Sequence, residues 1–383
     1  MLLESLEAEN FRNLSGKVSW GPGLNIIFGD NGQGKTNWLE AIYLLATTKS
    51  FRTQRPQEAI RFGENLAIVR GVVARSREVQ RELQVALQGS TKTLAVNGKR
   101  EAVTRYLGQL HTVAFTADEL EVVRGGPDAR RKFLDRGVVA LHHAYVQTLA
   151  NYQRVIKQKN RLLQDAADAE LSVAETSTRL EPWNEQITAL SAEIHRARTD
   201  YVNRLNAALE RRLFGHEEVT IRYVSALEGK GDLGDYEALL SERLRLRVQA
   251  EMAAGYALVG AHRDDLEILF DGRDIRSFGS SGQQRSALII LDLAAISVYH
   301  SWHNEYPLFL MDDVDAELDR KRIGHLLEYL EGRTQTFVTT SKEGLAELYA
   351  TRAHVVEIMD GVAQGIGAVT QEISAVITGT SGI

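Results

Sequence analysis

One eight-residue segment constrains this chain more than any other feature. Residues 29–36 read Gly-Asp-Asn-Gly-Gln-Gly-Lys-Thr, which fits the pattern G-x-x-x-x-G-K-[ST]. The apolar run Leu24–Phe28 precedes the segment and predicts a strand, and Asn37–Thr47 behind it predicts a helix. A glycine-rich loop between a strand and a helix wraps backbone N–H groups around phosphates, helped by the positive end of the helix. The sequence therefore predicts a phosphate-binding loop in an α/β fold.

The loop predicts a role for each of its residues. Lys35 is expected to reach the β- and γ-phosphates of a nucleotide, and the Thr36 hydroxyl is expected to hold Mg²⁺. Further nucleotide contacts are expected from Gly29, Asp30, Asn31, Gly32, Gln33 and Gly34. ATP and Mg²⁺ are therefore the predicted cofactors. The alternative is a glycine-rich turn with an incidental lysine.

A second pattern supplies paired carboxylates. The apolar run Leu308–Met311 predicts a buried strand, and Asp312 and Asp313 follow it directly. This is a Walker B pattern, in which Asp312 would bind Mg²⁺ and Asp313 would orient or deprotonate the attacking water. Lys35, Asp312 and Asp313 are therefore the candidate catalytic residues, with a simple strand-exit turn as the alternative for the two acids.

A third pattern indicates the class of ATPase. Gly279–Arg285 opens the apolar helix predicted over Ser286–Tyr299, and it resembles the L-S-G-G-Q signature of ABC-type ATPases. By that resemblance Ser280, Gly282 and Gln283 contact the nucleotide of a second protomer, which implies an ATP-sandwiched homodimer. A serine-rich helix cap is the alternative. Ala316–Asp319 resembles the D-loop that follows Walker B in the same ATPases.

The middle of the chain changes to helical periodicity. Apolar residues recur at helical spacing from Tyr145 to Leu163, and again from Ile187 to Leu209, after Pro182 in a predicted first helical turn. We predict an ATPase head built from residues 1–136 and 258–383, with a helical arm lobe at 137–257. In fold class this is an α/β, ABC-type P-loop ATPase head, similar to SMC and Rad50 heads, with an inserted helical arm.

The composition of the chain excludes several kinds of functional site and several classes of protein. The chain has no cysteine, which excludes disulfides, cysteine zinc sites, iron–sulfur clusters and thiol catalysis. The net charge of −6 divides into +5 over residues 1–136 and −11 over the rest. The basic N-terminal part could therefore present a phosphate-binding face. We find neither a signal peptide nor a membrane-spanning apolar segment, and we expect a cytoplasmic protein.

Taken together, these patterns resemble the RecF family of DNA repair ATPases nearly end to end. The resemblance is carried by Asn10–Leu14, Gly29–Ala41, Lys49–Arg52, Gly125–Pro127, Arg130–Asp135, Gly260–Asp265, Gly282–Arg285 and Leu308–Asp319. Ala117–Glu119 stands where the family usually has Pro-Glu-Asp, and Ala261 replaces a usual proline. By resemblance to related ATPases, Arg12 is expected to contact the nucleotide. The alternative is that its side chain is simply solvated. His262, with no second histidine at ligand spacing, is expected to have a structural role or to lie at the edge of the nucleotide site, rather than to bind a metal.

The resemblance implies a function in recombinational gap repair. ATP would drive a dimer that clamps duplex DNA or single/double-strand junctions, and the chain would help RecR and RecO to load RecA. Asp313 in place of the longer glutamate, and no histidine at residues 339–341, predict slow hydrolysis. The candidate DNA contacts are Arg130, Arg131, Lys132, Arg136, Lys157 and Lys159. The alternative is that these residues belong to ordinary charged helix faces. The alternatives are an ABC transporter ATPase subunit and a non-hydrolytic, ATP-gated interaction module.

Overall fold

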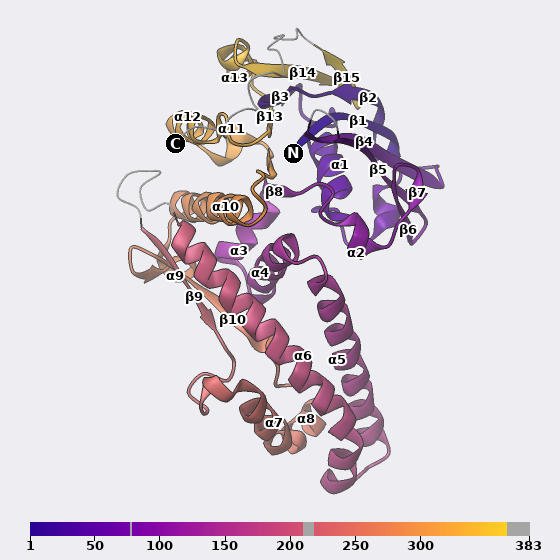
Figure 1. Ribbon diagram of the computed structural model, residues 1–383, viewed down its shortest axis with the longest axis vertical. Coiled ribbons are helices and arrows are strands. Elements are labelled where there is room, and N and C mark those ends of the chain that lie inside the picture. Colours follow the sequence, from indigo (N-terminus) through magenta and orange to yellow (C-terminus); the bar gives the residue numbers. More distant parts are fainter. Residues whose placement is uncertain (77–78, 210–217, 366–383) are drawn as a thin grey trace. The chain divides into compact units, whose positions relative to one another are not determined.

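The computed structural model describes residues 1–76, 79–209 and 218–365 (Figure 1). Among these residues, one compact unit contains 1–120 and 280–365, and we call it the head. The other contains 121–209 and 218–279, and we call it the arm. This division differs from the predicted boundaries after residues 136 and 257. The reason is that helix α4 (Pro127–Leu141) and strand β10 (Asp265–Phe270) pack against each other within the arm.

The first head sheet is antiparallel and has the strand order β2-β1-β4-β5-β6-β7. Its strands are β1 (Leu2–Phe11), β2 (Leu14–Ser19), β4 (Leu66–Ser76), β5 (Val79–Gln88), β6 (Thr91–Val96) and β7 (Lys99–Arg100). Burial alternates along the second half of β5, so one face of that strand is turned to the core.

The second head sheet has the order β15-β14-β3-β13-β12-β8, and all its neighbours are parallel except β14 and β15. Its strands are β3 (Leu24–Phe28), β8 (Thr112–Phe115), β12 (Leu308–Met311), β13 (Thr336–Thr340), β14 (Ala353–Met359) and β15 (Val362–Gly365). The predicted strands before the phosphate-binding loop and before the paired acids are confirmed residue for residue. Because β13 lies between β3 and β12, the carboxyl ends of these parallel strands meet at one edge.

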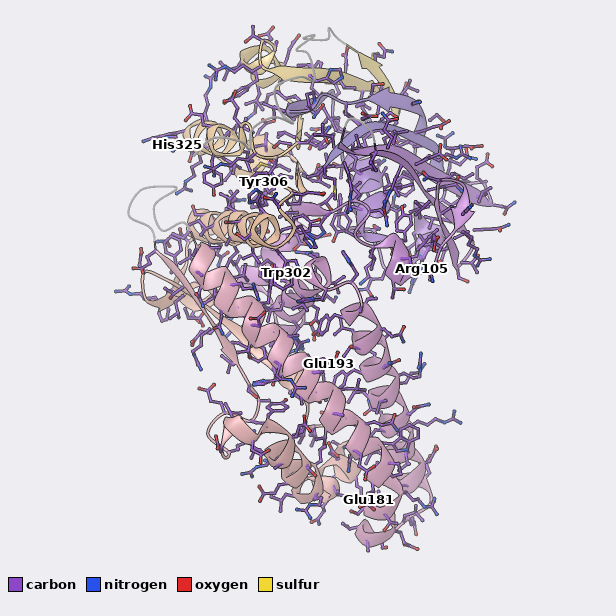
Figure 2. All side chains as sticks on the ribbon, viewed as in Figure 1. Arg105, Glu181, Glu193, Trp302, Tyr306 and His325 are labelled. Atoms are coloured by element: carbon purple, nitrogen blue, oxygen red, sulfur yellow. The ribbon has the colours of Figure 1, made fainter. Side chains whose placement is uncertain are left out.

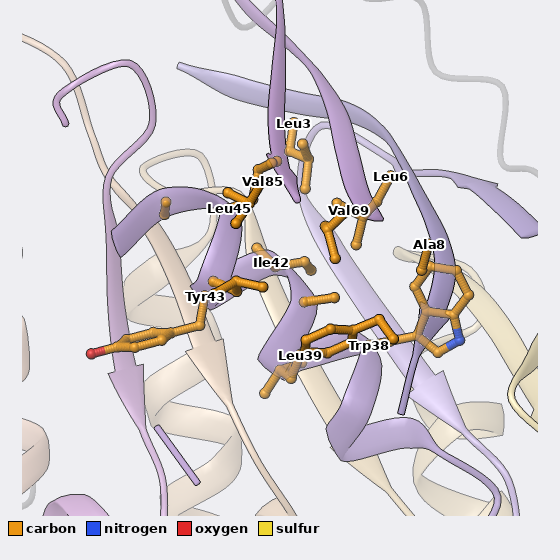
Figure 3. Packing of buried hydrophobic residues seen from close by; sticks show 14 of the residues in the cluster. Leu3, Leu6, Ala8, Trp38, Leu39, Ile42, Tyr43, Leu45, Val69 and Val85 are labelled. Atoms are coloured by element: carbon orange, nitrogen blue, oxygen red, sulfur yellow. The ribbon is translucent and has the colours of Figure 1, made fainter. Parts of the chain in front are cut away.

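Helix α1 (Lys35–Thr47) lies between the two head sheets and contacts strands of both. Its side chains are buried from Trp38 through Ala46, as expected for a helix covered on all sides. Figure 3 shows Trp38, Leu39 and Ile42 packed among Leu3, Leu6 and other side chains of the first sheet. This core fixes the start of α1, and with it the end of the glycine-rich loop.

The described part of the head contains further helices, some in contact with the first sheet and some with the second. They are η1 (Pro56–Ala59), α2 (Val103–Tyr106), η2 (Asp118–Leu120), α10 (Ser281–His303), α11 (Val314–Glu317), α12 (Arg320–Leu330) and α13 (Glu343–Tyr349). The long helix α10 contacts β8, and it begins five residues before the predicted Ser286 because Ser280 caps it. Across the described residues, we find no helix with the length and apolarity to cross a bilayer.

The arm is built on two long helices that pack side by side, α5 (Tyr145–Asp168) and α6 (Val173–Ala208) (Figure 1). Thr148 on α5 donates a 2.7 Å hydrogen bond to Glu193 on α6, which Figure 2 labels. The shorter helices are α3 (Glu121–Arg124), α4, η3 (Leu233–Asp235), α7 (Tyr236–Leu246), α8 (Val248–Ala254), η4 (Ala261–Arg263) and α9 (Ile275–Phe278). A three-stranded antiparallel sheet of β9 (Val219–Val224), β10 and β11 (Arg273–Asp274) completes the arm.

The start of α6 corrects one prediction. Pro182 lies inside the helix and not in its first turn. Ser172 caps the helix, and its hydroxyl accepts the Glu175 N–H while the Glu175 carboxylate accepts the Ser172 N–H. Leu180, upstream of the proline, packs on Leu163 of α5, so tertiary packing stabilises the turns that the proline alone disfavours.

Candidate functional site

The glycine-rich loop joins β3 to α1, and two of its glycines are required by geometry. Gly29 and Gly34 have φ angles of 147° and 108°, which side chains rarely allow. A Cβ on Gly29 would lie 2.5 Å from the Ile358 carbonyl oxygen, and one on Gly34 would lie 2.8 Å from Asn13 Oδ1. Because Gly34 caps α1, the positive end of that helix lies directly at the loop.

Lys35 points back into the loop. Its Nζ donates 2.8 Å hydrogen bonds to the carbonyl oxygens of Gly29 and Asp30. Burial lowers the pKa of Lys35, while the carboxylates of Asp313 and Asp312 act in the opposite direction. The ammonium group is thus held by backbone oxygens beside two acids, an arrangement that suits the exchange of carbonyl partners for phosphate oxygens.

Thr36 and Asp312 meet at the carboxyl edge of the parallel sheet. The Thr36 hydroxyl donates to Asp312 Oδ1 at 2.9 Å, and the Thr339 hydroxyl donates to the same oxygen at 2.7 Å. A hydroxyl and a carboxylate are oxygen ligands of the kind that Mg²⁺ prefers, and Mg²⁺ completes its shell with water and substrate phosphates. The residues present therefore fit the predicted cation.

Asp313 follows in the left-handed backbone region, with a φ of 47°. Its N–H donates to the Thr339 hydroxyl at 2.7 Å, so one threonine orients both acids. Burial raises the pKa of Asp313, and the charges of Asp312 and Asp315 raise it further, while Lys35 lowers it. A carboxylate with a raised pKa accepts a proton more readily, which is the property required of a general base.

Asp315 is a residue that the sequence analysis missed. Its Oδ2 accepts the Thr340 hydroxyl at 2.6 Å and the Ser341 N–H at 3.3 Å. These bonds tie α11 to the loop after β13, where the sequence has no histidine. No local pattern distinguishes Asp315 from its acidic neighbours, because its partners come from another strand.

The signature segment begins α10 with reciprocal hydrogen bonds. The Ser280 hydroxyl accepts the Gln283 N–H at 3.3 Å, and Gln283 Oε1 accepts the Ser280 N–H at 2.9 Å. Since Ser280 acts as the acceptor, its own hydroxyl proton stays available for an anion. Arg285 on the same helix forms a 2.7 Å ion pair with Glu317, which joins the signature to the D-loop.

Arg12 is anchored rather than solvated. Its guanidinium donates to both carboxylate oxygens of Glu40, at 3.1 and 2.8 Å, and its side chain is 20% exposed. Glu40 is fully buried on α1 and also accepts the Ser50 hydroxyl at 2.6 Å. Glu40 could not be predicted from the sequence, because a single acid in an apolar helix forms no pattern. The nucleotide contact of Arg12 stays a prediction.

Gln33 supports the loop from the protein side. Its Oε1 accepts the Asp360 N–H at 2.6 Å, and its carbonyl oxygen accepts the Gly361 N–H at 2.8 Å. The turn between β14 and β15 therefore braces the loop, a role that the motif does not reveal. The loop residues that stay exposed are Asp30, Asn31 and Gly32.

Two of the predicted DNA contacts need correction. Lys159 is fully buried and forms a 2.7 Å ion pair with Glu251, which is equally buried. Arg130 is 5% exposed and donates to both carboxylate oxygens of Asp265, at 2.7 and 2.9 Å. Both were predicted as candidate DNA-phosphate contacts, with an ordinary charged helix face as the alternative. Carboxylates from distant segments bind them inside the arm instead, out of reach of a phosphate backbone.

The other four candidates differ in exposure. The Arg131 side chain is 15% exposed, donates to the Asp264 carbonyl oxygen at 2.6 Å and pairs with Asp128. Its guanidinium is therefore also bound within the arm. Arg136 is half-buried and has a partner of its own. Lys132 and Lys157 are exposed. These two lysines remain the best placed for a phosphate contact.

The sequence of the chain matches a known protein family. Residues 2–364 match the family model of the RecF/RecN/SMC N-terminal domain. The chain is 34% identical over 372 residues to the DNA replication and repair protein RecF of Halothermothrix orenii, covering 94% of this chain and 98% of that protein. It is 37% identical over 352 residues to the protein of the same name from Geobacter sp. (strain M21), covering 89% and 93%. The chain belongs to the RecF family.

Solved structures agree with the RecF-family assignment. The chain resembles the recombination mediator protein RecF-ATPrS of the RecFOR pathway, with a TM-score of 0.85, 30% identity, and 96% and 98% of the two chains covered. The Smc head domain from Pyrococcus furiosus has a TM-score of 0.54 at 17% identity, with 95% of each chain covered. That second likeness concerns the fold alone, and the two together confirm the predicted fold class.

The segment Gly260–Asp265, which carried part of the RecF-family resemblance, forms a junction inside the arm. Asp264 is 1% exposed and accepts the Tyr223 hydroxyl at 2.5 Å. His262 Nδ1 lies 2.7 Å from the Tyr152 hydroxyl, and burial lowers the pKa of His262 to about 4. These contacts agree with the structural role that was predicted for His262.

Proposed function

We propose that this RecF-family chain is an ATP-dependent DNA-binding ATPase of recombinational gap repair and replication maintenance. The observation that carries the proposal is the meeting of Lys35, Thr36 and Asp312 at one edge of the parallel sheet. Further support comes from relatives named DNA replication and repair protein RecF, and from the likeness to RecF-ATPrS of the RecFOR pathway.

The nucleotide part of the proposal rests on the loop and the paired acids. Backbone N–H groups of the loop and the Lys35 ammonium bind the phosphates of ATP, and Thr36 and Asp312 hold Mg²⁺. Bound Mg²⁺ would neutralise charge on the phosphates as the terminal group leaves. Asp313 orients the attacking water and takes its proton. Aspartate is one methylene shorter than glutamate, so we propose slow, DNA-stimulated hydrolysis that acts as a timer.

The second part of the proposal is an ATP-driven homodimer. Ser280 and Gly282 of one head contact the γ-phosphate that is held by Lys35 of the partner subunit. The free hydroxyl proton of Ser280 supports this role, because the capping box uses the serine oxygen only as an acceptor. The dimer clamps duplex DNA or a single/double-strand junction, helps RecO and RecR load RecA in the cytoplasm, and resets on hydrolysis.

Light scattering on the full chain tests the dimer. The 42.6 kDa chain should double in mass with ATP and Mg²⁺, and duplex DNA should add only its own mass to that of the dimer. Asp313→Asn should keep the dimer while losing hydrolysis. A chain that stays monomeric with ATP would refute the clamp. A wild-type dimer that never hydrolyses ATP would make the chain an ATP-gated interaction module instead.

Mixing two inactive variants tests the shared site. A heterodimer of Lys35→Ala and Ser280→Ala contains one composite site with both defects and one with neither. Hydrolysis should therefore return on mixing, although each variant alone is inactive. No recovery in a mixture that still forms heterodimers would place Ser280 outside the partner's nucleotide site.

A further inference from the structure

Residues 49–62 of the head have no role in the proposed nucleotide chemistry or in the proposed DNA contacts. The segment lies between α1 and β4 and contains η1, and its first four residues carried part of the RecF-family resemblance. Its last residue, Phe62, is fully exposed, more so than any other large apolar side chain that the structure describes. Single exposed apolar side chains are common on protein surfaces, so exposure alone indicates nothing. Two further observations distinguish Phe62 from the ordinary case.

The first observation is that the backbone before Phe62 is tied to the first head sheet. Ile60 forms a β-bridge with Phe11 at the end of β1. The Arg61 guanidinium donates to the Leu14 carbonyl oxygen at 2.8 Å, across the turn between β1 and β2. The Arg61 N–H also donates to a carbonyl oxygen of β1 at 2.8 Å. The ring is therefore presented to solvent from an ordered backbone, so that binding a partner would cost little additional ordering.

The second observation is that the segment is basic. Its four cations and one acid give residues 49–62 a net charge of +3, from Lys49, Arg52, Arg55, Arg61 and Glu58. Including Glu64, the acid that follows Phe62, the charge is still +2. The buried Glu40 carboxylate lies 4.0 Å from Arg52, but its charge is already balanced by Arg12 at 2.8 Å. A segment with this excess of positive charge attracts phosphate groups.

We propose that Phe62 stacks on an unpaired DNA base while the cations of residues 49–62 bind the neighbouring phosphates. Every base has a π-face that stacks on an aromatic ring, and every base is followed by a phosphate, so a ring among cations suits a single strand. Within an intact duplex the faces of a base are covered by its neighbours, and the ring finds a partner only where the strands separate. An apolar pocket of a protein would also accept the ring, but the positive charge favours a polyanion.

This inference rests on the proposed DNA-binding function and gives it a physical cause for a preference for single/double-strand junctions. Fluorescence anisotropy on the full chain with ATP and Mg²⁺ tests it, with a labelled blunt duplex and a labelled duplex that carries a single-stranded overhang. Phe62→Ala should weaken binding to the overhang DNA about tenfold and leave binding to the blunt duplex unchanged. Phe62→Trp, which keeps an aromatic face, should bind the overhang DNA as wild type does, whereas Phe62→Leu should not.

An overhang of abasic nucleotides separates stacking from charge, because it keeps the phosphates and offers no base. Wild type should bind the abasic overhang about as weakly as Phe62→Ala binds the normal one, and Phe62→Ala should lose little more on the abasic DNA. Arg55→Gln should weaken binding to both overhangs equally and reduce the slope of log K against log salt by about 0.7. Leu348→Ala, which shortens an exposed apolar side chain on α13, is the matched control and should change none of these affinities.

Each other outcome overturns a defined part of the proposal. An equal loss on the blunt duplex and the overhang DNA would make Phe62 a wedge between paired bases, and wild-type binding by Phe62→Leu would make the contact merely apolar. Unchanged binding of all DNAs by Phe62→Ala would exclude the ring from the DNA interface. A wild-type chain that binds neither DNA would refute the proposed function itself. The urea midpoint of Phe62→Ala should match wild type, because a fully exposed ring contributes little to the fold.

Discussion

The Thr36 hydroxyl donates a 2.9 Å hydrogen bond to Asp312, although 276 positions separate the two residues. The bond forms because β3 and β12 both pair with β13 in one parallel sheet. Strands that end at the same edge deliver the residues after them to the same place. The two halves of the proposed magnesium site are therefore joined by sheet order and not by proximity in sequence.

Replacing Asp312 should uncouple nucleotide binding from magnesium. In Asp312→Asn the charged oxygen ligand is lost, and we expect at least a tenfold loss of ATP affinity in Mg²⁺ by calorimetry, with little change in EDTA. Asp232→Asn, on a surface turn of the arm, is the control. Equal loss with and without Mg²⁺ would show that Asp312 acts on the fold instead.

The pH dependence of hydrolysis should respond to Asp315. Its negative charge raises the pKa of Asp313, so Asp315→Asn should lower that pKa and move the acid limb of the rate profile to lower pH. Asparagine keeps an oxygen acceptor for the Thr340 hydroxyl. Asp360→Asn, beside the loop but outside the charges that shift Asp313, should leave the limb in place. A limb that does not move would remove Asp313 as the base.

Lys157 should contribute to the salt dependence of DNA binding. One lost phosphate contact in Lys157→Gln should weaken binding to all duplex sequences and reduce the slope of log K against log salt by about 1. Lys230→Gln makes the same charge change at another exposed position of the arm. If both variants alter the slope equally, the effect is one of net charge and not of contact.

Lys159 should matter for stability. Lys159→Met leaves the buried Glu251 carboxylate without its cation, at a cost of about 3–5 kcal/mol in the free energy of unfolding. Adding Glu251→Gln removes the charge, keeps an acceptor for the Leu258 N–H, and should restore most of the loss. Urea unfolding followed by circular dichroism measures both variants, with Lys157→Met as the exposed control. Lack of rescue by the second change would contradict a charge effect.

Stability should fall in acid partly through His262. Its pKa drops from 6.5 to about 4 on folding. Between these two values the imidazole is protonated in the unfolded chain and neutral in the folded chain. Stability is therefore complete above pH 6.5 and is lost as the pH falls toward 4, by at most about 3 kcal/mol. His262→Gln should flatten this part of the urea midpoint profile, whereas His325→Gln on α12 (Figure 2) should not. Parallel profiles in all three proteins would contradict the prediction.

Local patterns in the sequence were enough to predict the strands and the glycine-rich loop of the head. The strands before the loop and before the paired acids have the predicted bounds. Such elements are encoded by continuous apolar runs, and the loop is encoded by glycines that only a left-handed, crowded backbone requires. The two motifs therefore predicted the α/β fold and the residues that gather at the sheet edge, and the signature segment added the ABC-type class.

Outside the motifs, only the tertiary structure decided which partners the charged side chains bind. Arg130 and Asp265 lie 135 positions apart, and their pairing turned a predicted DNA contact into part of the arm's interior. Glu40 and Asp315 acquired their roles in the same way, from partners on other segments. A backbone conformation is set by neighbours in sequence, whereas the burial and partners of a long charged side chain depend on which distant segments the fold brings beside it.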